Sequence, residues 1–159
     1  MHASQGVGRL AIIIGQCGAI PSLLGLLQTS ESILQKVILK CLRNIVTSGD
    51  TNSLTAVTNG GLEIILNMLL NANSGGLKRP LLEILSALSL LREVRRVIFS
   101  SGDVCFLIES ARCGRMISRT RTAQAIGMMG LVKKSKADTC SFWCGESTHG
   151  IDSEWGYFS

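Results

Sequence analysis

The sequence predicts an all-α fold of stacked helical repeats, and three observations favour this class. Of the 159 residues, 46% are hydrophobic but only 4% are aromatic, so the core must be built from aliphatic side chains. That composition suits stacked helices better than a β-sandwich, which favours aromatic residues and Thr. Similar blocks recur with a period of 42 residues, and each block is followed by a longer apolar pattern with helical spacing.

The glycines that open the blocks show the period most clearly. Gly18, Gly60 and Gly102 are separated by 42 residues each time, within CGAIPSLLGLL (17–27), NGGLEIILNML (59–69) and SGDVCFLIESA (101–111). A glycine at 18, at 60 or 61, and at 102 is predicted to form a sharp bend between a short helix and the next one. Such a bend needs either positive φ or close backbone approach.

A long helix is predicted after each block, over 30–46, 75–91 and 115–132. In the first, Ser30 is the predicted N-cap, and apolar side chains follow at helical spacing. They are Ile33, Leu34, Val37, Ile38, Cys41, Leu42 and Ile45. Pro80 falls in the first turn of the second long helix, where its missing N–H costs least.

Each unit is therefore predicted to hold a short, a medium and a long helix. The predicted units are 9–48, 49–91 and 92–134, within an array over 9–138. Residues 1–8 form an N-terminal extension, and 139–159 form a non-repeat aromatic and acidic tail. Because no unit can bury its apolar face alone, the units must stack.

The uncharged stretch 10–30 is long enough to span a membrane. Glycines, Pro21 and polar residues dilute it, and Arg9 is the single basic residue before it, so a signal or anchor is the weaker alternative. The six cysteines show no disulfide framework, and Cys17, Cys41 and Cys105 are predicted to act as small hydrophobes. A reducing cytoplasmic or nuclear location is expected.

The stretch GAIPSLLGLL followed by SESILQKVILKCLRNIV resembles an armadillo repeat. The resemblance covers roughly residues 9–136 and is strongest in the first unit, and the later residues are also similar to plant members of the family, here truncated after about three repeats. It implies a right-handed α-solenoid of about three armadillo-like three-helix repeats. It also implies a concave groove lined by the third helices and a non-catalytic binding scaffold, with no cofactor.

Importin-α-like members clamp a peptide backbone with a Trp and an Asn four residues apart on each third helix. The corresponding positions here hold Lys40 and Asn44, Glu83 and Ala87, and Gln124 and Met128. Only Asn44 matches, so the stacking indoles and amide ladder of nuclear-signal recognition are missing. Asn44 is interpreted either as a contact to a partner backbone or as a capping or solvated residue.

Charge is concentrated in residues 78–136, which carry twelve basic and four acidic side chains. Arg112, Arg115, Arg119 and Arg121 surround the start of the third long helix, with no matching acidic residue nearby in the sequence. Two interpretations remain open: solvated turns, with lysines 133, 134 and 136 complementing the helix dipole, or a docking surface for an acidic or phosphorylated segment. Without aromatics between the arginines, nucleic-acid bases have no stacking platform.

No motif for catalysis is present, so no enzyme activity, small-molecule substrate or metal is expected. Zinc held by Cys140, Cys144, His149 and Asp152 is the weaker alternative to an unrelated grouping. Five of the seven aromatic residues follow residue 141. This tail is interpreted either as a non-repeat end or as a cap on the last repeat.

The predicted function is a protein-interaction scaffold that binds an acidic or phosphorylated partner segment. The alternatives are the substrate-recognition part of a ubiquitin ligase system and a basic nucleic-acid-binding module. The predicted partner-binding residues are Lys40, Asn44, Glu83, Gln124, Arg112, Arg115, Arg119 and Arg121.

Overall fold

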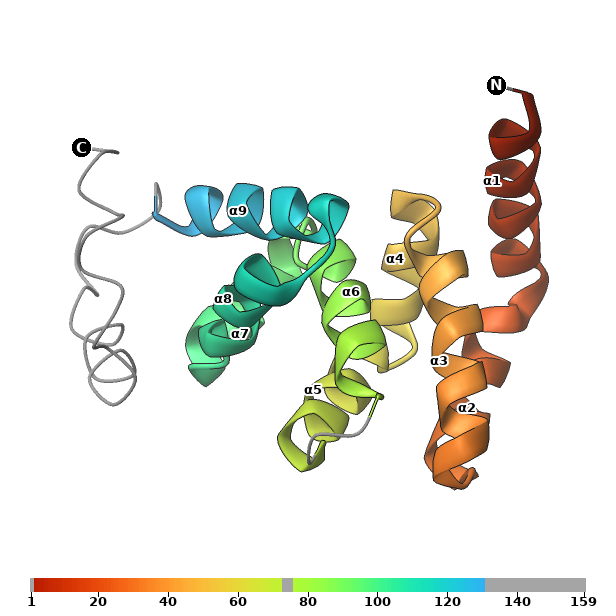
Figure 1. Cartoon of the computed structure of the whole chain (residues 1–159), viewed down its shortest axis with the longest axis horizontal. Helices are drawn as coiled ribbons and strands as arrows, with labels where there is room; N and C mark the ends of the chain where they lie inside the picture. The colour runs from red at the N-terminus through yellow and green to blue at the C-terminus, as the bar shows by residue number, and fades with distance from the viewer. Residues whose placement is uncertain (1, 73–75, 131–159) are drawn as a thin grey trace.

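The computed structural model describes residues 2–72 and 76–130, and their side chains from residue 6 onward. This part of the chain is helical and contains no strand. Three successive sets of helices follow one another along the long axis (Figure 1). The first set holds α1 (His2–Ile14), η1 (Gly15–Ala19), α2 (Ile20–Thr29) and α3 (Ser32–Val46). The second set holds α4 (Asp50–Thr58), α5 (Gly61–Asn71) and α6 (Lys78–Leu88). The third set holds α7 (Arg92–Ser101), α8 (Val104–Cys113) and α9 (Met116–Gly130). The arrangement is an armadillo-type α-solenoid, as predicted.

The predicted glycine bends are confirmed. Gly18, Gly60 and Gly102 have φ of 86°, 77° and 80°, in the left-handed region that glycine adopts without steric cost. Of the two glycines at 60 and 61, Gly60 has the positive φ and Gly61 is required for close backbone approach. A Cβ on Gly61 would lie 2.6 Å from the Ala56 carbonyl oxygen, so this position requires close backbone approach.

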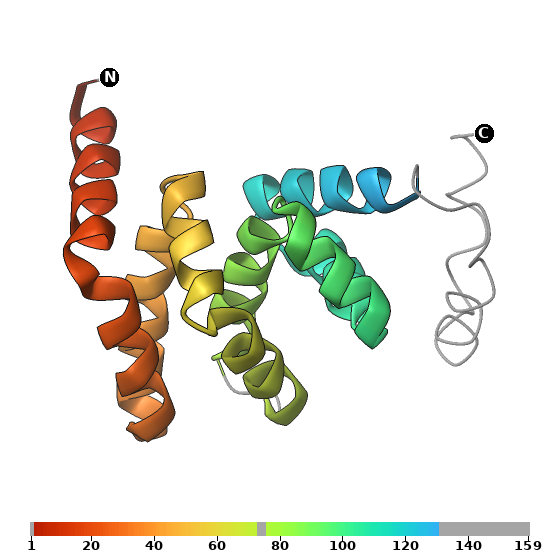
Figure 2. The same ribbon diagram turned by 180° about the vertical axis from the view of Figure 1, so that it is seen from behind.

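The predicted order of a short, a medium and a long helix is not kept in any set: α5 and α6 both have 11 residues, and α7 and α8 both have 10. The first set departs from it most. Its first helix, α1, has 13 residues and is longer than the 10-residue α2. A wide π-type turn, η1, joins them, and Gly18 breaks the helical geometry inside it. The resulting bend between α1 and α2 is visible in Figure 2.

The predicted N-cap at Ser30 is wrong. Glu31 precedes α3 in extended conformation, whereas the Ser30 hydroxyl donates to the Leu26 carbonyl oxygen and so closes α2. Pro80 lies in the first turn of α6, as predicted.

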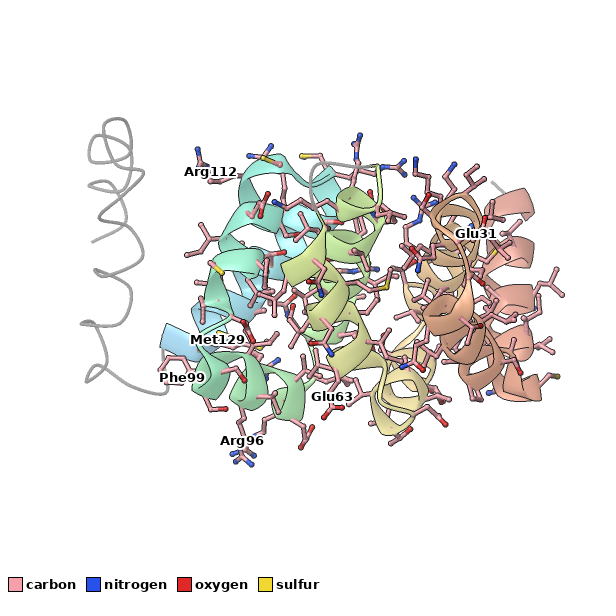
Figure 3. The ribbon with its side chains drawn as sticks, turned by 90° about the horizontal axis from the view of Figure 1, so that it is seen from below. Glu31, Glu63, Arg96, Phe99, Arg112 and Met129 are labelled. Carbon is pink, nitrogen blue, oxygen red and sulfur yellow. The ribbon has the colours of Figure 1, made fainter. Side chains whose placement is uncertain are left out.

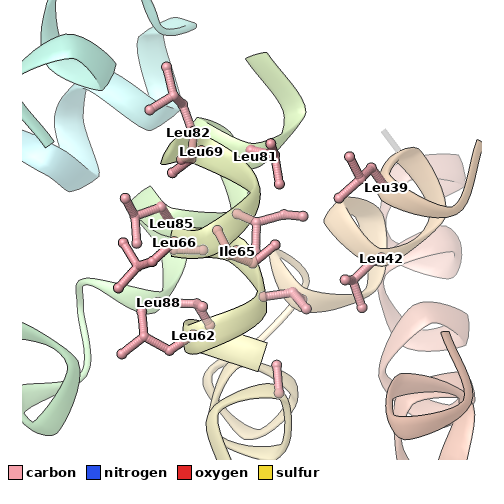
Figure 4. Packing of buried hydrophobic residues seen from close by; sticks show 14 of the residues in the cluster. Leu39, Leu42, Leu62, Ile65, Leu66, Leu69, Leu81, Leu82, Leu85 and Leu88 are labelled. Carbon is pink, nitrogen blue, oxygen red and sulfur yellow. The ribbon is translucent and has the colours of Figure 1, made fainter. Parts of the chain in front are cut away.

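The core is aliphatic and is centred on α6. Every residue from 80 to 89 is buried, because α6 packs against α5 within its own set and against α3 and α9 in the neighbouring sets. Figure 4 shows the leucines of α5 and α6 together, with Leu39 and Leu42 pointing toward them from α3. Stacking therefore supplies burial that no single set provides.

The apolar pattern of α3 does not coincide with its buried face. Ile38, Leu39, Leu42, Ile45 and Val46 are buried. The predicted core positions Ile33, Leu34 and Val37 are 78%, 51% and 54% exposed, and Cys41 is exposed too. Apolar residues surround most of this helix, and only the side that meets its neighbours is covered.

The cysteines in the described residues are free thiols, but their burial was not predicted correctly. Cys17 and Cys41 are exposed and Cys105 is half-buried, so none of them is a core residue. Burial raises the pKa of the Cys105 thiol, with Asp103 and Glu109 adding to that rise and backbone hydrogen bonds opposing it. Cys140 and Cys144, the possible zinc ligands, lie outside the described residues, as does the whole aromatic tail.

The segment Gly6–Thr29 is long and apolar enough to span a membrane by length and composition. The helix pair Asp50–Thr58 and Gly61–Asn71 meets the same test only when taken together, and it is bent by 80°. Within Gly6–Thr29 the helix breaks at Gly18, and Ile20, Leu24 and Leu27 enter the core beyond that break. These features favour a repeat boundary over a continuous span.

A buried amide joins the first set to the second. Asn52, on α4, is 1% exposed, and its Nδ2 donates to the carbonyl oxygens of Ala11 at 3.2 Å and Ile45 at 2.9 Å. Gly15 makes room for this side chain, because a Cβ at that position would clash with the Asn52 carboxamide. Ser53 adds a hydrogen bond to the Val46 carbonyl oxygen. The carboxyl ends of α1 and α3 are thereby tied to α4.

Replacing Asn52 with alanine is expected to lower the free energy of unfolding by about 1–3 kcal/mol, because the hydrogen bonds from its Nδ2 to the Ala11 and Ile45 carbonyl oxygens are lost. Asn67→Ala, at an exposed site on α5, is the matched control and should change it by less than about 0.5 kcal/mol. Urea unfolding followed by circular dichroism measures both. Equal effects of the two substitutions would contradict a junction role for Asn52.

Candidate functional site

The third helices of the three sets are α3, α6 and α9, and α6 packs against both of the others. Their middle is organised around Glu83 of α6, whose side chain is 7% exposed. Glu83 Oε2 accepts a hydrogen bond from Arg43 Nη1 at 3.1 Å. Its Oε1 lies 3.2 Å from Arg115 Nε and 3.7 Å from Arg79 Nε. We call Glu83, Arg43, Arg79 and Arg115 the Glu83 cluster.

The Glu83 cluster draws on all three sets. Arg43 comes from α3, Arg79 from α6, and Arg115 directly precedes α9. Within the described residues Oε1 makes no aligned hydrogen bond, so its contacts with Arg79 and Arg115 are ionic. A buried carboxylate needs such partners, because an unpaired charge at that depth costs several kcal/mol.

Asn44 holds Arg43 in place. Arg43 Nε and Nη2 both donate to Asn44 Oδ1, at 3.2 and 3.0 Å, while Nη1 reaches Glu83. The predicted site residue Asn44 is thus linked to the predicted site residue Glu83 through Arg43, which is not among the predicted site residues. Asn44 is exposed, and its oxygen is occupied within the chain.

A second arginine also bridges the outer third helices. Arg121 of α9 donates from Nη2 to the Thr47 carbonyl oxygen at the end of α3, 3.2 Å away. Partial burial lowers the pKa of the Arg121 guanidinium, and nearby Asp50 opposes that shift. The group remains a cation at neutral pH, because an arginine pKa lies far above it. Arg121 thus links α9 to the end of α3 directly, whereas Arg43 and Arg115 each pair with Glu83 of α6.

The structure separates the other predicted site residues. Arg119 and Arg121 are two positions apart on α9, about 200° around a helix, so they lie on opposite flanks. Arg119 Nε donates to the Ala111 carbonyl oxygen of α8 at 3.1 Å, away from Glu83. Lys40, Gln124 and Arg112 are exposed, and within the described residues no hydrogen bond or ion pair joins them to the cluster.

Two of the positions aligned with peptide-clamping residues are closed to solvent. Glu83 and Ala87 on α6 are each 5% exposed, whereas Lys40, Asn44, Gln124 and Met128 on the outer helices are exposed. Glu83 therefore faces the arginines of its own chain. The exposed ladder of positions runs over α3 and α9 and is interrupted at α6.

The expectation that the arginines lack acidic partners is wrong for Arg115. Its partner Glu83 lies 32 positions earlier and reaches it only through the packing of α6 against α9. Lys78 likewise pairs with Glu109, with Nζ 2.7 Å from Oε1. Sequence proximity could not reveal these pairs. The 42-residue period does not reveal them either, because the paired residues lie 32 and 31 positions apart and are not equivalent in successive sets.

No cluster of potential metal ligands occurs among the described residues. The lysines at 133, 134 and 136, predicted to complement the dipole of the last helix, lie outside the part that the structure describes.

Replacing Glu83 with alanine is expected to lower the free energy of unfolding by about 1–3 kcal/mol. The value is below that for a fully buried pair, because the three guanidiniums remain partly hydrated. Glu109→Ala breaks the half-exposed pair with Lys78 and serves as the control, expected to cost less than about 1 kcal/mol. Thermal unfolding in low salt compares the two variants. If Glu83→Ala lowers the stability no more than the control does, the Glu83 cluster does not stabilise the fold.

Comparison with known proteins finds a family model that is similar to part of the first set. Residues 9–47 match the family model described as Armadillo/beta-catenin-like repeat, a range that covers the C-terminal part of α1 and all of η1, α2 and α3. No curated protein and no solved structure matches the chain. Armadillo repeats are generally protein-interaction scaffolds and are typically non-catalytic. The residues that match an armadillo repeat are followed along the chain by two further sets of three helices.

Proposed function

We propose that this chain is a non-catalytic scaffold that binds an acidic segment of a partner protein across its third helices. The observation that carries the proposal is the exposure of basic side chains at and around these helices. Lys40, Arg79, Arg112, Arg115 and Arg119 are all exposed. Figure 3 shows side-chain nitrogens gathered along the edge of the molecule that carries Arg112, whereas Arg96 points from the opposite edge.

A partner segment would meet two kinds of group on this surface. Arg115 and Lys40 offer charge, and arginine in particular forms paired hydrogen bonds with a carboxylate. Asn44 and Gln124 offer amides; Asn44 gives its oxygen to Arg43 and has its Nδ2 left for a backbone carbonyl. Glu83 and Arg43 do not contact the partner segment directly. Their ion pair joins α3 to α6 beneath the exposed side chains.

The basic surface also admits the nucleic-acid alternative, and salt dependence alone does not separate the two. Binding of nucleic acid releases counterions and weakens steeply with salt whatever the base sequence. Binding of an acidic peptide also weakens with salt. The peptide should compete with RNA only if both bind at the third helices. Competition between an acidic peptide and bulk RNA is therefore part of the test.

The variant with Arg115→Glu and Arg119→Glu is expected to lose binding to acidic peptides while keeping its helicity. The substitutions place two negative charges at the start of α9, where the incoming segment is also negative. The control is the variant with Arg92→Glu and Arg96→Glu on α7, which makes the same charge change at exposed sites outside the third helices. Fluorescence anisotropy with an arrayed set of acidic peptides gives the affinities, and circular dichroism gives the helicity.

Unchanged peptide affinity in the Arg115 and Arg119 variant would contradict the proposal. So would an equal loss in the α7 control, because net charge alone would then explain binding. Bulk RNA that outcompetes every acidic peptide would favour the nucleic-acid module instead.

A further inference from the structure

We infer that Arg79 and Arg115, held in place by Glu83, form a binding site for the phosphoryl group of a phosphorylated partner segment. The inference rests on the proposed function and makes it more specific. It assigns a ligand chemistry to one point of the third-helix surface, and it changes the role of Glu83 from a partner contact to a positioning residue.

The geometry leaves the outer edges of two guanidiniums available. Arg79 and Arg115 both direct Nε at Glu83 Oε1, at 3.7 and 3.2 Å. Because both Nε atoms lie within 4 Å of one oxygen, the two guanidiniums are neighbours. Their side chains are 65% and 59% exposed, and within the described residues no hydrogen bond occupies their Nη atoms. Arg43, by contrast, spends its donors on Asn44 and Glu83.

The charge of the Glu83 cluster matches a phosphoryl group better than a carboxylate. Three guanidiniums and one carboxylate leave a net charge of about +2, and a phosphorylated side chain carries about −1.5 to −2 at neutral pH. An aspartate or glutamate would neutralise only half of that charge. Two adjacent guanidiniums can also engage several oxygens of one phosphate in paired hydrogen bonds, which a single carboxylate cannot supply.

The placement of these arginines is unfavourable for the helices themselves. The first turns of α4, α5 and α7 contain Asp50, Glu63 and Glu93, as the helix dipole favours. Those of α6 and α9, like those of α1, α2, α3 and α8, contain no acidic residue; Arg79 lies in the first turn of α6, and Arg115 directly precedes α9. Cations at the positive end of a helix cost stability, and Glu83 offsets only part of that cost. A bound dianion would complete the compensation.

Glu83 does not obstruct such a ligand, because it lies beneath the guanidiniums and its side chain is 7% exposed. Both of its oxygens face arginines of the chain. The carboxylate therefore attracts the Nε side of Arg79 and of Arg115, while both side chains stay largely exposed. This pre-organisation reduces the entropy that two long side chains would otherwise lose on binding.

The test uses three arrayed peptide sets with the same degenerate flanks. The central residue is phosphoserine in the first, glutamate in the second and serine in the third, and affinity for the full chain is measured by fluorescence anisotropy at 0.15 M salt. The best phosphoserine peptides are expected to bind at least tenfold more tightly than their glutamate twins. In the variant with Arg79→Gln and Arg115→Gln, that advantage should fall to within about twofold. The matched variant with Arg92→Gln and Arg96→Gln should keep it.

A second measurement locates the site. Inorganic phosphate, titrated into the chain, is expected to shift the Nε–Hε resonances of Arg79 and Arg115 and to leave those of Arg92 and Arg96 in place. Shifts of similar size at all four arginines would overturn the assignment, because they would report unspecific attraction to positive charge.

The outcomes separate this inference from the proposed function. Equal affinity for phosphoserine and glutamate peptides would overturn the phosphoryl site and leave the acidic-segment scaffold standing. A phosphoserine preference that survives in the Arg79 and Arg115 variant would overturn the location. Absence of binding to every acidic or phosphorylated peptide would overturn both.

Discussion

The structure depends on apolar side chains that are buried between neighbouring sets of helices, because no single set buries them completely. The third helix of the middle set, α6, shows this most directly, since residues 80–89 are all buried between α3 on one side and α9 on the other. A short helix with one apolar face would be marginal in water by itself. Here the apolar side chains surround the helix, so α6 requires both neighbours. The hydrogen bonds of Asn52 and Ser53 then fix how the first set meets the second.

The same helix carries the main electrostatic contact. Glu83 is buried among the leucines of α6, yet it gathers arginines from each of the three sets. A buried carboxylate contributes little net stability compared with a hydrophobic residue of similar size, but it orients its partners strongly. Packing and charge are therefore coupled: moving α3 or α9 away from α6 would both expose the core and separate Arg43 or Arg115 from Glu83.

Local signals in the sequence predict much of the fold. The 42-residue spacing of Gly18, Gly60 and Gly102 identifies the bends, because a left-handed backbone conformation strongly favours glycine. The position of Pro80 follows from backbone chemistry in the same way. Burial on α3 could not be predicted, since apolar residues such as Ile33 and Val37 stand on a side that no neighbouring helix covers. The Glu83 cluster was missed because its members are up to 72 positions apart and meet only after the sets stack.

Hydrogen exchange of the native chain tests the dependence on stacking most directly. If α6 is stabilised from both sides, its backbone amides should be the most protected and should exchange only through global unfolding, while those of α1 and α9 exchange through smaller openings. Protection in α1 or α9 equal to that in α6 would contradict this account. Exchange of α6 ahead of its neighbours would contradict it outright.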